Sequence, residues 1–368
     1  MSTPPDNNTT AQDRASGIRT GIALSGGVDS AVAAALLIEA GHRVEGFFLR
    51  LPVAHAAADE AAARRVAEQL GITLTVIEAE EAFLREVVDP FTNLYRKGMT
   101  PNPCVRCNQR IKLGLLARAM REAGMERIAT GHYARLYGLD GLHGLHDHPV
   151  IARAADPTRD QSYFLARVDP GLLPRLLLPL GEWTKTQVRE QARALNLPHV
   201  ERESQDVCFL DRPLADFLRA QGLADHPGPI CDTTGHTIGE HRGLWRYTIG
   251  QRRGLGLPDA TPWYVAALDV ASNRLVVGKR DELLRAGCTV QEPHWMVPPP
   301  ALPLQALVQL RSRHTPSPAT LHADGRLLFS HPQRAVTPGQ FAVFYQDDRV
   351  IGSAVIAADH NPAATTSP

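Results

Sequence analysis

The sequence predicts an α/β protein with a doubly wound parallel sheet, followed by a small central domain and a C-terminal β-barrel. Between residues 19 and 134, short apolar segments alternate with helical segments, which is typical of a parallel sheet. Glycines follow the helical segments, as expected where a helix ends in a left-handed residue. From about residue 225 onward, many short strands at close spacing predict a small barrel.

The expected elements follow in chain order. Strands are predicted at residues 21–24, 44–49, 73–77 and 127–130. Helices are predicted at residues 29–40, 59–70, 81–97, about 109–123 and 185–195, with Thr184 as N-cap of the last. Later strands are predicted at residues 263–270, 274–278, 304–313, 320–323, 326–329, 340–345 and 350–356. The proline run 298–300 is interpreted as a linker before the barrel.

These elements divide the chain into predicted domains. Residues 1–17 are expected to be a disordered tail and residues 18–220 the sheet domain. The central domain is expected at 221–289, the barrel at 290–359 and a second tail at 360–368.

Composition limits the classes of protein to which the chain can belong. Its 368 residues are 43% hydrophobic and 21% charged, which is typical of globular proteins. Acidic and basic residues balance at 39 each, so a nucleic-acid partner would need a local basic patch. Five cysteines exclude a secreted disulfide framework, and no apolar run is long enough for a membrane span. We therefore expect a cytoplasmic protein.

The segment Ser25-Gly26-Gly27-Val28-Asp29-Ser30 follows a predicted strand and opens a predicted helix. Two glycines allow backbone N–H groups to approach an anion, and the helix N-terminus adds roughly half a positive charge. The segment therefore predicts a phosphate-binding loop. It lacks the lysine of a P-loop and the G-x-G-x-x-G spacing of a dinucleotide site. The alternative is a chance Gly-Gly turn.

Two cysteines, Cys104 and Cys107, precede the helix expected from about residue 109, for which Asn108 is the predicted N-cap. Cys107 is then expected to face the positive helix end beside Arg106 and Arg110, and both features favour a thiolate. A lone C-x-x-C could also be half of a zinc site, a redox pair or an inert pair. We find no second ligand pair at metal-like spacing in the sequence and expect no metal site.

Two further segments leave alternatives open. Taken alone, a cysteine between Val207 and Phe209 is typical of a small buried hydrophobic residue, which would make Cys208 inert. The Gly/His-rich stretch 138–148 predicts an exposed insertion, with a zinc site through its histidines as the alternative.

The loop S-G-G-x-D-S resembles the pyrophosphate-binding loop of ATP pyrophosphatases, which cleave ATP between its α and β phosphates. Together with six further strings it makes the chain similar to the family of tRNA-specific 2-thiouridylases over about residues 18–357. The strings lie at residues 23–30, 100–108, 129–134, 160–165, 206–210, 248–256 and 336–340.

The resemblance implies a set of site residues. ATP would be held by Ala23, Leu24, Ser25, Gly26, Gly27, Val28, Asp29, Ser30, Leu49 and Gly131. Cys107 would be the nucleophile and Cys208 the cysteine that carries a persulfide. The target base would face Asn102, Pro103 and Cys104, and tRNA would contact His132, Arg159, Asp160, Gln161, Arg311, Ser312 and Gln340. Basic residues after Cys107, Lys112 among them, would support RNA binding if they gather on one face.

The chain departs from the family pattern at three places. Cys104 stands where the commoner pattern has Asp, so an acidic role there is lost or supplied elsewhere. Arg159 replaces a frequent Lys, which keeps the charge but changes the geometry. Residues 50–58 are shorter than usual, on the expected adenine side of the pocket.

The implied reaction is ATP-dependent thiolation of C2 of the wobble uridine, position 34 of tRNA, with release of AMP and pyrophosphate. Sulfur would come from the persulfide, and the cycle would end either in a Cys107–Cys208 disulfide or in earlier release of hydrosulfide. Both routes need a reductant. The resemblance further implies Mg²⁺ with the ATP and an upstream sulfur-donor protein, either a cysteine desulfurase or a sulfur relay.

Two other classes of function stay open from the sequence. One is an ATP pyrophosphatase with a small substrate, which would need neither Cys107 nor Cys208. The other is a non-catalytic tRNA-binding protein that keeps a relic ATP loop.

Overall fold

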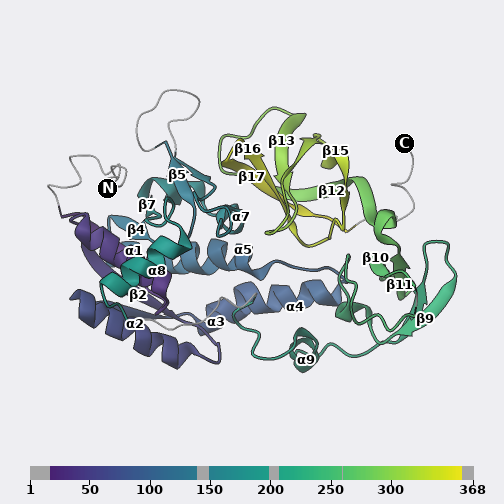
Figure 1. Ribbon diagram of the computed structural model, residues 1–368, viewed down its shortest axis with the longest axis horizontal. Helices are drawn as coiled ribbons and strands as arrows, with labels where there is room; N and C mark the ends of the chain where they lie inside the picture. The colour runs from purple at the N-terminus through teal and green to yellow at the C-terminus, as the bar shows by residue number, and fades with distance from the viewer. Residues whose placement is uncertain (1–16, 139–148, 199–206, 259, 359–368) are drawn as a thin grey trace. The chain divides into compact units, whose positions relative to one another are not determined.

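The computed structural model describes residues 17–138, 149–198, 207–258 and 260–358 (Figure 1). The chain separates into two compact units, each of three segments. Unit 1 is residues 1–86, 104–209 and 348–350, and unit 2 is residues 87–103, 210–347 and 351–368. The predicted tails and the insertion at 138–148 lie outside the described residues, apart from Gly17 and Gly138. The predicted domain boundaries at 18–220, 221–289 and 290–359 stay predictions.

Unit 1 is built on a five-stranded parallel sheet with the strand order β3-β2-β1-β4-β7 (Figure 1). Its strands are β1 (Arg19–Ala23), β2 (Arg43–Arg50), β3 (Leu74–Glu78), β4 (Arg127–Ala129) and β7 (Leu176–Leu177). The predicted parallel sheet is confirmed. The strand order reverses between β1 and β4, and ligands of such sheets bind beyond the carboxyl ends of the strands at this point.

Three long helices of unit 1 are α1 (Val28–Glu39), α2 (Ala56–Leu70) and α8 (Lys185–Ala194). All three were expected from the sequence. The glycines act as predicted, because Gly41, Gly71 and Gly124 all have positive φ angles just past a helix end. Gly71 is the left-handed C-cap of α2.

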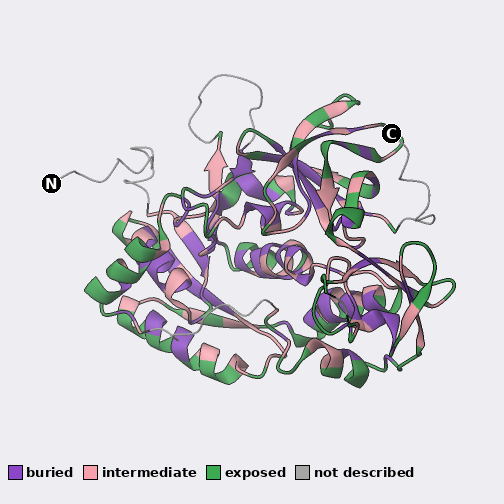
Figure 2. Ribbon diagram, turned by 45° about the vertical axis from the view of Figure 1, so that its right-hand side comes forward, coloured by how far each residue is buried: buried purple, intermediate pink, exposed green. Residues whose placement is uncertain are grey.

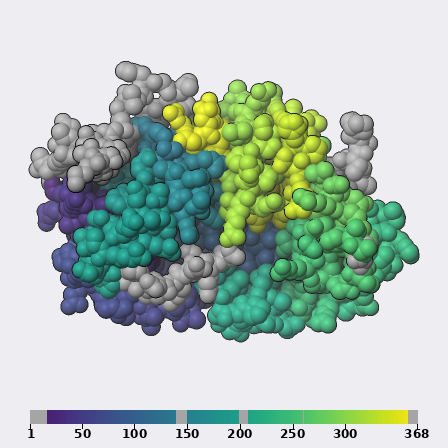
Figure 3. Space-filling model, in the orientation of Figure 1, coloured from purple at the N-terminus to yellow at the C-terminus, as the bar shows by residue number. Residues whose placement is uncertain are grey.

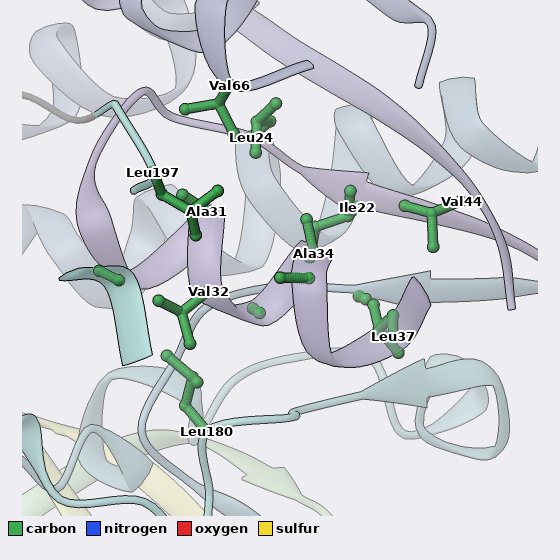
Figure 4. Packing of buried hydrophobic residues seen from close by; sticks show 14 of the residues in the cluster. Ile22, Leu24, Ala31, Val32, Ala34, Leu37, Val44, Val66, Leu180 and Leu197 are labelled. Atoms are coloured by element: carbon green, nitrogen blue, oxygen red, sulfur yellow. The ribbon is translucent and has the colours of Figure 1, made fainter. Parts of the chain in front are cut away.

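The core of unit 1 surrounds α1 (Figure 4). Ala31, Val32, Ala33 and Ala34 have no exposed surface, so α1 is covered on nearly all sides. It packs against β1 and β2 and against Val188 and Ala192 of α8, in one cluster shown partly in Figure 4. Small alanines allow this close approach. Figure 2 shows the resulting pattern, with buried residues inward and exposed ones along the outer faces of the helices.

The helix that carries the cysteine pair begins earlier than predicted. It comprises α5 (Pro103–Cys107), a π-helical segment η3 (Asn108–Leu116) and α6 (Ala117–Glu122). Pro103 opens it, and proline is favoured at this position because its φ angle already suits a helix. The prediction that Asn108 caps a helix starting at about 109 is therefore wrong, since Asn108 lies inside the helix and is buried.

Unit 2 contains a four-stranded sheet and a β-barrel. The sheet has the order β10-β11-β8-β9, and the barrel order β12-β15-β14-β13-β16-β17 is closed by pairing of β12 with β17. The predicted barrel is confirmed. The strands are β8 (Gly228–Cys231), β9 (Thr237–His241), β10 (Tyr264–Asp269), β11 (Arg274–Gly278), β12 (Leu284–Trp295), β13 (Leu304–Gln309), β14 (Ser317–Leu321), β15 (Arg326–Arg334), β16 (Phe341–Gln346) and β17 (Arg349–Ile356).

The proline run 298–300 lies between β12 and β13, two strands of the same barrel. Its interpretation as a linker before the barrel is wrong, because β12 already pairs with β15 and β17.

The remaining elements are shorter. They are α3 (Glu80–Phe83), a π-helical segment (Leu84–Val88), α4 (Asp89–Arg96), β5 (Arg135–Tyr137), β6 (Val150–Ala152), α7 (Ser162–Leu165), α9 (Leu214–Ala220) and 3₁₀ turns at Pro170–Arg175, Leu244–Arg246 and Arg280–Leu283. No helix among the described residues is long and apolar enough to cross a membrane.

Asp348 belongs to unit 1 although it lies near the end of the chain. Its carboxylate accepts hydrogen bonds from Arg135 (2.7 Å) and from the hydroxyl of Tyr137 (3.3 Å). Its backbone carbonyl accepts one from Arg153 N (2.9 Å). Asp348, which follows β16, thus makes three hydrogen bonds with residues of unit 1.

Candidate functional site

The predicted phosphate loop connects β1 to α1 at the carboxyl edge of the sheet. Gly26 has φ +78°, and a Cβ there would lie 2.5 Å from Asp59 O, so only glycine fits. The Ser30 hydroxyl donates to Gly27 O (3.0 Å), accepts from Ser25 N (3.1 Å) and lies 3.1 Å from the Ser25 hydroxyl. Gly27 is the N-cap of α1 and supplies no capping side chain. The first-turn N–H groups therefore remain suited to an anion.

The other residues expected to hold ATP gather around this loop. A Cβ on Gly131, just beyond β4, would lie 3.0 Å from both Asp29 C and Ser30 N, so the two backbones touch. Leu49 is half-buried near the end of β2, the neighbour of β1. The sheet thus brings the loop, Leu49 and Gly131, which are separate in the sequence, to one edge. ATP binding itself stays a prediction.

Two residues that the sequence analysis missed hold the Asp29 carboxylate. The Tyr133 hydroxyl donates to Asp29 Oδ1 at 2.7 Å, and Lys185 Nζ lies 2.5 Å from the same oxygen. The Lys185 ammonium also lies 5.8 Å from the centre of the Tyr133 ring. Burial, and then the hydrogen bond to Asp29, raises the pKa of Tyr133. Tyr133 is therefore a proton donor here, not a phenolate.

The position of Lys185 is fixed by the start of α8. Thr184 forms the predicted N-cap, and its capping box with Gln187 is complete. Asp156 accepts a hydrogen bond from Lys185 N (3.2 Å), and it also accepts from both the backbone and the hydroxyl of Thr158. The Thr158 hydroxyl is the main cause that lowers the pKa of Asp156. These hydrogen bonds hold the backbone of Lys185 in place at the start of α8.

Cys107 lies at the end of α5, inside the continuous helix, and is 8% exposed. Burial raises the pKa of its thiol to about 12, while the charge of Lys112 acts in the opposite direction. The prediction that a helix N-terminus favours the thiolate is wrong, because the helix begins four residues earlier, at Pro103. The thiol form is favoured in the structure described here.

The π-helical segment explains why Lys112 acts on Cys107. In an α-helix, residues five apart diverge by about 140° around the axis. In a π-helix the backbone bonds join residues five apart, so Cys107 and Lys112 lie toward the same face. The charge of Lys112 also lowers the pKa of Cys208 and of His132. One ammonium therefore lies near three of the predicted site residues.

Cys208 is exposed, and the buried side chain of its string is Phe209. The Phe209 ring packs edge-on against Phe83, with ring centres 5.7 Å apart. The interpretation of Cys208 as a buried hydrophobic residue is thus wrong. Burial of its sulfur is the main cause that raises the pKa of Cys208. All five cysteines are among the described residues and are free thiols.

The expected tRNA contacts of unit 1 differ in exposure. Arg159 is exposed, whereas His132 is 9% exposed, and burial lowers its pKa to about 3. The Asp160 carboxylate is occupied by Arg153 (3.0 Å) and by the Ser162 hydroxyl (3.0 Å). Contact of these residues with tRNA stays a prediction, and His132 would make it as a neutral ring.

Gln161 is bonded to the backbone of Tyr133 in both directions. Its N–H donates to Tyr133 O at 2.8 Å, and its side-chain Oε1 accepts from Tyr133 N at 2.9 Å. Gln161 thus fixes the residue that holds Asp29, and its expected tRNA contact stays a prediction.

In unit 2, Gln340 adjoins the segment that leads from α4 to Asn102 and Pro103. Its side-chain Nε2 donates to Thr100 O (2.7 Å), and Thr100 N donates to Pro338 O (2.9 Å). Gln340 thus contacts Thr100, two residues before Asn102, although Gln340 and Asn102 are 238 residues apart in the sequence.

The half-buried residues Arg311 and Ser312 follow β13, and their carbonyls accept from the Gln309 side chain. Within the described ranges, no group of three or more His, Cys, Asp or Glu side chains could hold a metal ion.

Three family models match the chain in order. One described as "tRNA methyl transferase HUP domain" covers residues 19–212, a "tRNA methyl transferase PRC-barrel domain" covers 215–279, and an "Aminomethyltransferase beta-barrel domain" covers 285–356. With the parallel sheet and its glycine loop, they define the class as a HUP-domain protein that carries two β domains.

Curated relatives identify the family within this class. The tRNA-specific 2-thiouridylase MnmA of Chloroflexus aurantiacus is 45% identical over 355 residues, which cover 91% of this chain and 97% of the relative. The protein of the same name from Syntrophotalea carbinolica is 42% identical over 349 residues, with 91% and 97% covered. The chain belongs to the family of tRNA-specific 2-thiouridylases.

Proposed function

We propose that this protein uses ATP and a protein-bound persulfide to replace O2 of uridine 34 in tRNA with sulfur, releasing AMP and pyrophosphate. The observation that carries the proposal is the placement of two cysteines. Cys107 and Cys208 are 101 residues apart in the sequence, yet the charge of Lys112 acts on both thiols, and Cys208 also acts on Cys107. A pair of thiols in a chain that also carries a lysine-free phosphate loop suits sulfur transfer coupled to ATP.

ATP would bind along residues 23–30 with its phosphates on the first-turn N–H groups of α1. The uridine O2 would attack the α phosphate, and pyrophosphate would leave. Asp29 is the carboxylate beside this loop, and Mg²⁺ is commonly held by one or two carboxylates together with substrate phosphates. Asp29 would therefore hold Mg²⁺, which neutralises charge on the triphosphate.

Sulfur transfer would then use the two cysteines. The terminal sulfur of a Cys208 persulfide would attack C2 of the adenylated uridine, and AMP would depart. Attack of Cys107 on the inner sulfur would complete transfer and leave a Cys107–Cys208 disulfide. The alternative is that Cys107 first releases hydrosulfide, which then attacks C2. In both routes a dithiol reductant resets the pair, and an upstream sulfur-donor protein reloads Cys208.

The remaining proposals follow from this chemistry. The chain would bind tRNA through Arg159, Arg311, Gln340 and their predicted companions. It would work in the cytoplasm, where thiols stay reduced.

The reaction can be tested with the full chain, a tRNA transcript, ATP and a persulfide donor. We expect 2-thiouridine by nucleoside mass spectrometry together with AMP and pyrophosphate. Asp29→Ala should form none of the three, and Cys208→Ser should form no 2-thiouridine. Lys97→Met alters an exposed lysine of unit 2 and serves as the control. ADP and phosphate as products would contradict the proposal. Full activity without Cys107 and Cys208 would favour a small-substrate pyrophosphatase, and tRNA binding without ATP consumption would favour a non-catalytic protein.

A further inference from the structure

The phosphate loop lacks a lysine, so the positive charge for a triphosphate must come from elsewhere. Among the 39 basic residues only four are lysines, namely Lys97, Lys112, Lys185 and Lys279. Of these, Lys185 is in direct contact with the loop, because its ammonium lies 2.5 Å from the carboxylate of Asp29. A flexible single-point cation thus lies beside the loop in a chain whose basic residues are mostly arginine.

Lys185 is placed to reach the loop without movement of its helix. Asp29 belongs to the first turn of α1, whose N–H groups form the predicted cradle. Lys185 is the first residue of α8, which is tied down at its start by Thr184 and Asp156. The Lys185 side chain is 17% exposed and that of Asp29 is 32% exposed, so solvent and ligand can reach the pair. The outer side of α8 forms part of the teal surface in Figure 3.

The three-residue cluster of Asp29, Tyr133 and Lys185 can exchange partners without leaving a charge unpaired. When Mg²⁺ and a triphosphate arrive, Asp29 can pass from the ammonium to the cation. Lys185 then turns to a phosphate oxygen, and the Tyr133 hydroxyl remains on Asp29. A charge-assisted hydrogen bond of this kind contributes more than a neutral one.

From these contacts we infer that Lys185 is a binding residue for the β and γ phosphates of ATP, held on Asp29 until the nucleotide arrives. The inference rests on the proposed use of ATP and adds a residue to it. A purely structural ion pair between α1 and α8 is the competing explanation, and it predicts equal effects on every ligand of the site.

The test is calorimetric binding of MgATP, pyrophosphate and AMP to the full chain without tRNA. In Lys185→Met, affinity for MgATP and pyrophosphate should fall about ten- to hundredfold, and affinity for AMP should stay within about twofold. Lys97→Met is the matched control and should change none of the three. Unchanged pyrophosphate affinity in Lys185→Met would overturn the inference, as would an equal loss for AMP.

A second measurement uses the unaltered protein and does not depend on how the variant folds. Amine acylation followed by peptide mass spectrometry should show that pyrophosphate protects Lys185 but not Lys97, and that AMP protects neither. Failure of the unaltered protein to bind MgATP would refute the proposed function, and the inference with it. Binding of MgATP without protection of Lys185 would refute the inference alone.

Discussion

The protonation state of Cys107 can be measured by raising the pH. Burial raises the pKa of this thiol to about 12 from an ordinary value of 9. Three pKa units correspond to about 4 kcal/mol against the thiolate. At pH 8 about one molecule in ten thousand would then carry the thiolate, compared with about one in ten for an ordinary thiol of pKa 9. Since only the thiolate reacts, alkylation of Cys107 should be about a thousandfold slower.

The assay is iodoacetamide labelling of the ligand-free chain from pH 7 to 10.5, with each cysteine followed by peptide mass spectrometry. The Cys107 rate should rise about tenfold per pH unit without a plateau, and it should equal the other cysteine rates in urea. Lys112→Met should slow labelling of Cys208, because the Lys112 ammonium lowers its pKa, whereas Lys97→Met should not. A plateau below pH 9, or a neutral-pH rate of Cys107 equal to its own rate in urea, would refute the desolvation argument.

Three further predictions concern stability and sulfur transfer. The folded pKa of His132, about 3, lies below its unfolded value of about 6.5, so the free energy of unfolding decreases as the pH falls. Between pH 7 and pH 5, urea denaturation should show that the parent protein loses about 2 kcal/mol more of this free energy than His132→Asn does. Phe209→Ala should lower the free energy of unfolding by about 3 kcal/mol and slow single-turnover thiolation, whereas Phe209→Leu should do so less; an unchanged rate would mean that the ring does not position Cys208. Thr184→Ala should cost about 1 kcal/mol in thermal unfolding and Thr184→Ser almost nothing, and equal losses would contradict the capping role.

The sequence predicted the parts of the fold that depend on local patterns. Alternation of strands and helices, the closing glycines and the Thr184 cap are short-range signals, and all three are confirmed. The start of the helix at Pro103 was missed, although a proline at the first position is a recognised signal, because Asn108 offered a competing one. Strand β12 was missed because its alternation is interrupted by register shifts around Gly287 and before His294.

The site was predicted less completely than the fold because its partners are distant in the chain. Lys185 and Asp29 are 156 residues apart in the sequence, and no local sequence pattern predicts the contact between them. The link between Cys107 and Lys112 depends on a π-helical register, for which residue preferences give no rule. The exposure of Cys208 depends on Phe209, which turns inward in its place.

The interleaving of the two units limits how this protein can be divided. Each unit is assembled from three segments that alternate along the chain, so no cut at a single codon yields two fragments that are each one whole unit. A fragment ending near residue 290 would also lack Asp348 and would leave the guanidinium of Arg135 without its 2.7 Å carboxylate partner. Loss of function in such a fragment would therefore report damage to unit 1 as well as loss of the barrel. Point substitutions on the barrel surface are the way to separate the two effects. A protease that cuts the chain once should leave the two fragments associated until the protein is denatured, because each unit contains segments from distant parts of the chain.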